Sequence, residues 1–180
     1  MFATMLSAMF ALLFTLPLAS AWQQHRVTVG PNAQLIYDPP FISADIGDKV
    51  IFSFRQKNHT VTQSSFQSPC TPLLGPDGVT VIAFNSGFNP VGADVVDNFP
   101  EVSLTVLTTD PLWFHCEQTG HCAQGMVFAI NPPADGNTFD KFKAAALATA
   151  APPTGGSHAR AENNRATRYA TARAAFAAKD

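Results

Sequence analysis

Three side chains with metal-binding chemistry occur at equal spacing in one short segment. Cys116, His121 and Met126 are five residues apart, so one loop carries a thiolate, an imidazole and a thioether. Soft sulfur with imidazole nitrogen suits copper in both of its oxidation states, and a weakly bound Met completes a site of two His and one Cys. The segment therefore predicts a mononuclear copper site that still lacks its second His. Taken singly, the same residues would be a buried thiol, a loop His and a core Met.

The second His has to come from another part of the chain. We expect it to be His59, which lies just beyond an expected strand at residues 49–54, where a neighbouring strand could bring it beside the loop. His59 also stands inside the sequence Asn58-His59-Thr60, which makes Asn58 a candidate N-glycosylation site and His59 alternatively a surface residue of that sequon. A glycan there would crowd the metal site.

Alternating apolar residues identify the strands that must position these ligands. Val50, Phe52 and Phe54 fall on one side of a two-residue period, as expected for a half-buried strand after the turn pair Gly47-Asp48. Similar β-branched or aromatic runs occur at residues 25–29, 102–107, 112–116 and 126–130. Several short strands at this spacing predict an all-β sandwich over residues 22–133.

The first 21 residues have the features of a cleaved secretory signal. They carry no charged side chain and end in Ala19-Ser20-Ala21, a small-x-small pattern that signal peptidase accepts. The alternative is an uncleaved membrane anchor. Export into an oxidising compartment lets two of the three cysteines pair, so the third needs a separate explanation.

Residues 134–180 differ in composition from the strands before them. Asn137 or Thr138 is placed to cap a short helix through Ala150, and a low-complexity tail rich in Ala and Arg follows. The predicted strand region has 4 basic and 9 acidic residues, net −5, whereas residues 134–180 have 7 and 4, net +3. We expect a mostly disordered tail; the alternative is an arm that docks on acidic wall polymers or on the acidic domain. The overall charge of −2 does not support nucleic-acid binding.

Several of these segments together resemble one known family. The chain resembles the secreted fungal relatives of the plant phytocyanins, which are cupredoxins. The resemblance is carried by residues 47–54 (GDKVIFSF), 58–63 (NHTVTQ), 69–70 (PC) and 113–126 (WFHC through GM). The resemblance covers residues 27–131 and implies a Greek-key sandwich of eight or so strands. It also implies one copper ion, Cu(II)/Cu(I), held by His59, Cys116, His121 and Met126.

The resemblance further implies a disulfide between Cys70 and Cys122. In an extended chain Cys122 would point away from a metal bound by the preceding His121, which leaves its thiol free to pair. Such a bridge would hold the ligand loop from behind.

Three other metal-site hypotheses use the same residues. A structural zinc site could recruit Cys70, Cys116, His121 and Cys122, but it leaves Met126 without a role and needs reduced thiols outside the cell. A multicopper oxidase would need a His-Cys-His run, which Glu117 interrupts after His115-Cys116, and His-x-His pairs, which are absent from the sequence. An oxidative polysaccharide-cleaving enzyme would need a metal-binding N-terminal His, and His25 becomes the N-terminus only if processing continues past Trp22.

The sequence thus predicts a secreted, monomeric, non-enzymatic cupredoxin that carries single electrons outside the cell, with an unidentified redox partner and possible cell-wall contacts. We expect no membrane span after signal cleavage. The alternative function is a wall-associated interaction or copper-sequestering protein built on the same scaffold.

Overall fold

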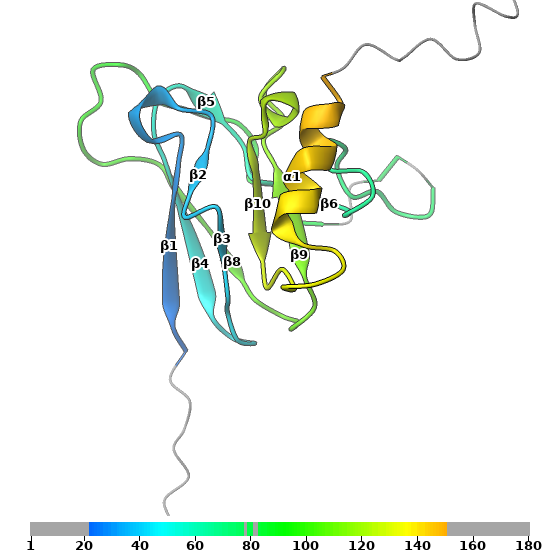
Figure 1. Cartoon of the computed structure of the whole chain (residues 1–180). Helices are drawn as coiled ribbons and strands as arrows, with labels where there is room; N and C mark the ends of the chain where they lie inside the picture. The colour runs from blue at the N-terminus through cyan, green and yellow to red at the C-terminus, as the bar shows by residue number, and fades with distance from the viewer. Residues whose placement is uncertain (1–21, 78, 81–82, 151–180) are drawn as a thin grey trace, which may run out of the picture.

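Two four-stranded sheets face each other in a sandwich (Figure 1). The computed structural model describes residues 22–77, 79–80 and 83–150. The expected signal at residues 1–21 and the tail from residue 151 lie outside these described residues. One sheet has the strand order β2-β1-β4-β8 and the other β3-β10-β9-β6, with a separate β5-β7 pair. This arrangement confirms the predicted all-β sandwich.

The strands are short, and most pair antiparallel. β1 lies parallel to β4, and β3 parallel to β10. The first sheet comprises β2 (Tyr37–Asp38), β1 (Gln24–Val29), β4 (Lys49–Phe54) and β8 (Glu101–Thr105). The second comprises β3 (Phe41–Ile42), β10 (Val127–Ile130), β9 (Leu112–His115) and β6 (Thr62–Ser64). The small pair joins β5 (Asn58–His59) to β7 (Asn89–Pro90).

The core lies between the two sheets, and Phe52 stands near its centre. The Phe52 ring is 5.4 Å from the ring of Phe128 in an edge-on arrangement and 6.4 Å from that of Phe114. The alternation predicted for β4 holds, because Val50, Phe52 and Phe54 are fully buried. The other face of β4 is also covered, and Arg55 donates a hydrogen bond of 2.8 Å to Ser53 there.

The helix α1 (Phe139–Ala148) packs on the outer face of the second sheet (Figure 1). Thr138 caps it by accepting a hydrogen bond of 3.3 Å from the backbone N–H of Lys141. The Phe142 ring lies 4.7 Å from that of Trp113 on β9. Although the composition changes at Pro133, the helix belongs to the folded unit, because its apolar side covers this sheet. No helix in the described part of the chain combines the length and apolar character needed to cross a membrane.

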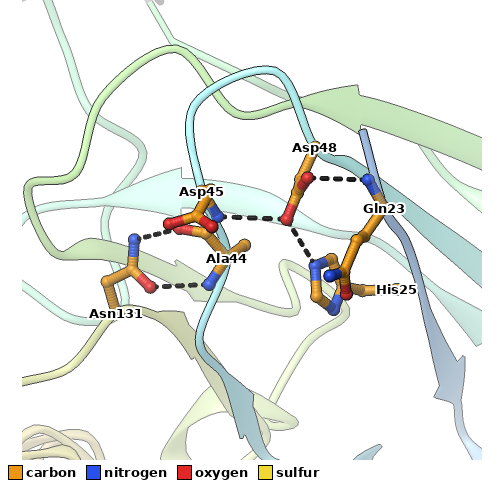
Figure 2. A network of polar contacts seen from close by, with 6 residues as sticks. All are labelled: Gln23, His25, Ala44, Asp45, Asp48 and Asn131. Carbon is orange, nitrogen blue, oxygen red and sulfur yellow. Dashed lines mark hydrogen bonds and ion pairs between the residues drawn. The ribbon is translucent and has the colours of Figure 1, made fainter. Parts of the chain in front are cut away.

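A polar cluster ties the start of β1 to the turn before β4 (Figure 2). The buried carboxylate of Asp48 accepts from the backbone N–H of Gln23 at 2.8 Å and of Asp45 at 3.0 Å, and it pairs with His25 Nε2 at 2.8 Å. Beside it, the Asn131 amide donates to the carbonyl of Ala44 and accepts from its N–H. The hydrogen bond with His25 and those from the backbone N–H groups of Gln23 and Asp45 lower the pKa of Asp48 from 3.8 to about 2.

This cluster predicts a loss of stability in acid. Because the folded-state pKa of Asp48 lies below its unfolded value, its stabilising effect is complete above about pH 4 and is lost as the pH falls toward 2. We expect Asp48→Asn to lower the free energy of unfolding at pH 6 and to flatten its fall between pH 4 and 2, as measured by denaturant titration. Asp135→Asn, the same change at an exposed residue, should leave both unaltered. Equal curves for the two variants would contradict this role.

Candidate metal centre

Three of the four predicted ligands meet at one end of the sandwich. His59 lies on β5, Cys116 directly follows β9, and His121 lies in the loop beyond it. One nitrogen of each imidazole and the Cys116 sulfur lie within 4.8 Å of one another. The Cys116 sulfur is 3.5 Å from Nδ1 of His121 and 3.9 Å from Nδ1 of His59. Thiolate and imidazole donors that converge in this way can hold a single ion.

Backbone hydrogen bonds close the ligand loop at its two ends. The N–H of Cys116 donates to the carbonyl of Met126 at 3.2 Å, and the N–H of Met126 donates to the carbonyl of His121 at 3.1 Å. A short 3-10 helix, η2 (Cys122–Gln124), fills the loop and ends at Gly125 with a φ of 87°. The Met126 side chain is completely buried in the same core cluster as Cys116. The loop thus buries Met126 in the core that also contains Cys116.

The imidazole of His59 is held by the backbone before it. Its Nε2 lies 3.1 Å from the carbonyl oxygen of Gln56, which only accepts hydrogen bonds. The backbone N–H of Lys57 also points at Nε2, at 3.2 Å, so two backbone groups hold this edge of the ring while Nδ1 faces the Cys116 sulfur. Metal-binding His residues are commonly oriented by such a bond from their other nitrogen.

Thr60 connects the two chain segments that carry His59 and Cys116. Its backbone N–H lies 3.4 Å from the Cys116 sulfur, and its hydroxyl accepts from the N–H of Glu117 at 2.8 Å. The Glu117 carboxylate in turn accepts from the Thr62 hydroxyl and from the side-chain amide of Asn85, each at 3.0 Å. Thr60 and Thr62 are fully buried, so this network fixes the spacing of the two segments.

Burial keeps the candidate ligands neutral while no cation is bound. It raises the pKa of the Cys116 thiol and lowers the pKa of both His59 and His121. Neutral imidazoles are ready to bind a cation, whereas the thiol must first release its proton. His59 and Cys116 are each 1% exposed, and His121 is only partly covered, so solvent reaches the centre at His121.

Comparison with known proteins shows the family of this chain. No family model matches the chain. It is 32% identical over 121 residues to the probable GPI-anchored cupredoxin-1 of Arthroderma benhamiae, a match that covers 67% of this chain and 58% of the relative. The chain belongs to the fungal cupredoxins. An extracellular serine-rich protein of the same organism is 33% identical over 119 residues, which cover 65% of this cupredoxin and 42% of that protein.

This cupredoxin therefore spans about half the length of the curated relatives that it matches. Among solved structures, reduced auracyanin from Roseiflexus castenholzii aligns with a TM-score of 0.42 and 16% identity, over 62% of this chain and 97% of that one. Auracyanin A of Chloroflexus aurantiacus, described as a blue copper protein, aligns with a TM-score of 0.41 and 16% identity, over 59% and 95%.

The disulfide implied by the family resemblance is present between Cys70 and Cys122. It joins the segment after β6 to the start of η2, directly behind His121, and α1 covers it, with the Thr149 hydroxyl 3.5 Å from the Cys70 sulfur. Cys116 remains the free thiol of this cupredoxin. Because two of the three thiols are oxidised, the alternative Cys₃His zinc site does not form.

Other His residues considered as ligands lie outside the converging group. His115 is buried on the opposite side of β9 from Cys116, and burial lowers its pKa to about 4. His25 pairs with Asp48 near the start of β1, far along the strand from the end that approaches His59 (Figure 2). Neither belongs to the described group of potential metal ligands.

The amide of Asn58 is already engaged. Its Nδ2, the atom that a glycan would modify, lies 3.4 Å from the side-chain oxygen of Gln118 in the ligand loop. Use of the sequon would have to break this contact, so glycosylation of Asn58 remains only a sequence prediction.

Sequence reasoning missed the groups that hold the ligands. Thr60 stands within the resembling segment, but nothing in the sequence connects its hydroxyl to Glu117. The Gln56 carbonyl is a backbone group and leaves no trace in the residue pattern.

Proposed function

We propose that this cupredoxin binds one copper ion through His59, Cys116, His121 and Met126 and carries single electrons outside the cell. The observation that supports this most directly is the convergence of the Cys116 thiol with two imidazole nitrogens in a largely buried site. Two His and one Cys with a weak axial Met form the donor set of blue-copper electron-transfer centres. Copper in such a centre supplies a one-electron Cu(II)/Cu(I) couple.

The surrounding residues suit a carrier because they restrict movement of the ligands. Gln56 orients His59, Thr60 ties Cys116 to the neighbouring segment, and the disulfide holds the loop behind His121. A site that changes little between oxidation states exchanges electrons with little rearrangement. His121, the partly exposed ligand, is the route by which a partner would approach.

The extracellular or cell-surface location is also a proposal. It rests on the names of the two relatives, one GPI-anchored and one extracellular, and on the disulfide, which suits an oxidising compartment. The net charge of −5 over residues 22–133 favours a basic redox partner.

Electron-exchange kinetics test this function. Stopped-flow mixing of the copper-loaded protein with a soluble one-electron reductant, then with an oxidant, should show rapid reduction and equally rapid reoxidation over repeated cycles. Slow reduction that leaves Cu(I) tightly retained would contradict the carrier role and support copper sequestration on the same scaffold.

A further inference from the structure

Gly30 lies against the imidazole of His59. It follows β1, is buried, and has a φ of +73°, in the left-handed region that favours glycine. A Cβ at this position would overlap Nε2 of His59 and lie 2.7 Å from its Cδ2 and 3.0 Å from the carbonyl oxygen of Gln56. The glycine therefore occupies the place where a side chain would meet both the ring and the group that orients it.

The backbone at Gly30 has little freedom to withdraw from the ring. Its N–H donates to the carbonyl of Ile36 at 2.9 Å, and the carbonyl of the preceding Val29 accepts from the N–H of Arg55 at 2.8 Å. β1 is also paired with β4 along its full length. Because Arg55 directly precedes Gln56, the segment that carries the glycine and the segment that orients His59 form one hydrogen-bonded frame. A side chain at residue 30 would displace the imidazole rather than the backbone.

We propose that Gly30 is a positioning residue for His59. The missing side chain lets the end of β1 close over the Nε2 edge of the ring. The ring then keeps its contacts with the Gln56 carbonyl and the Lys57 N–H and turns Nδ1 toward Cys116. The consequence for metal binding rests on the proposed copper site, whereas the effect on the ring is a property of the metal-free protein.

The chain provides a matched control for substitution at Gly30. Gly136 has a φ of +72°, and a Cβ there would meet no atom within 4 Å. Alanine at Gly136 thus brings the same backbone strain as alanine at Gly30, without a contact. Any difference between Gly30→Ala and Gly136→Ala reports the contact with His59.

The first test observes the His59 ring in metal-free protein by nitrogen NMR. Wild-type and Gly136→Ala should give the same chemical shifts for the His59 ring nitrogens, and Gly30→Ala should give different ones. With Cu(II) added, Gly30→Ala should bind about 10- to 100-fold more weakly than Gly136→Ala, the usual range when a ligand loses its orienting group. The same ring-nitrogen shifts for His59 in all three metal-free proteins would overturn the proposal. If Gly30→Ala changes the His59 ring but the wild-type protein binds no copper, the copper site is refuted and the positioning role stands.

A second measurement applies if Gly30→Ala folds poorly. In a His59→Ala background the obstructing ring is gone, so Gly30→Ala should lower the denaturant midpoint no more than Gly136→Ala does. With His59 present, Gly30→Ala should lower the midpoint clearly more than Gly136→Ala does. If Gly30→Ala lowers the midpoint more than Gly136→Ala by the same amount with and without His59, another contact is responsible and the proposal is overturned.

Discussion

Cys116→Ser is expected to abolish the intense blue absorption of the copper-loaded protein and to weaken Cu(II) binding strongly. That absorption requires a covalent bond between Cu(II) and a thiolate, which a serine hydroxyl does not replace. Cys116 is the free cysteine of the chain, and the other two are joined in the disulfide. No second thiol is therefore present to take its place.

The domain itself should survive this substitution. Serine is close in size to cysteine, and its hydroxyl accepts a hydrogen bond from the backbone N–H of Thr60, which lies 3.4 Å from the Cys116 sulfur. Denaturant unfolding of the two metal-free proteins provides the control and should give nearly equal free energies. A folded variant that keeps the blue absorption would show that Cys116 is not the thiolate ligand.

Removing the disulfide is expected to lower the free energy of unfolding more than any of the other substitutions does. Cys70 and Cys122 are separated by 52 residues in sequence. Closing a loop of this length restricts the unfolded chain, and the chain-entropy model gives a stabilisation of about 4 kcal/mol. The variant should change both residues to Ala, because a single change would leave a reactive thiol behind the ligand loop.

The expected result is a fall in the free energy of unfolding of about 4 kcal/mol, measured by denaturant titration of the metal-free proteins. Wild-type protein treated with a reductant should show a similar fall, which separates loss of the bridge from loss of the sulfur atoms. Because Cys122 follows His121, copper should also be released faster from the variant. A difference below about 1 kcal/mol would mean that packing of α1 against Cys70 and Cys122 already holds the loop.

Much of the site could be predicted from the sequence because its ligands are close together in the chain. Cys116, His121 and Met126 lie in one loop, so their spacing alone limits how far apart they can fold. The strand at residues 49–54 was predicted with its observed bounds, because its apolar residues alternate and a turn precedes it. His59 was expected from its place just beyond that strand and was also implied by the family resemblance, but its approach to Cys116 depends on how the sheets pair.

The remaining features depend on tertiary contacts that a residue pattern does not encode. Gly30 precedes His59 by almost thirty residues, and only the pairing of β1 with β4 brings them together. Likewise, the short helix was predicted from its cap, but its packing on Trp113 was not. The few apolar residues of the helix did not indicate that it covers the outer face of the second sheet.

The most direct test of the central claim is a titration of the purified metal-free protein with Cu(II), followed by visible absorption and metal analysis. We expect an intense blue band that rises linearly and stops at one copper per chain. A protein that stays colourless, or that binds copper without this band, would contradict the proposed site of His59, Cys116, His121 and Met126.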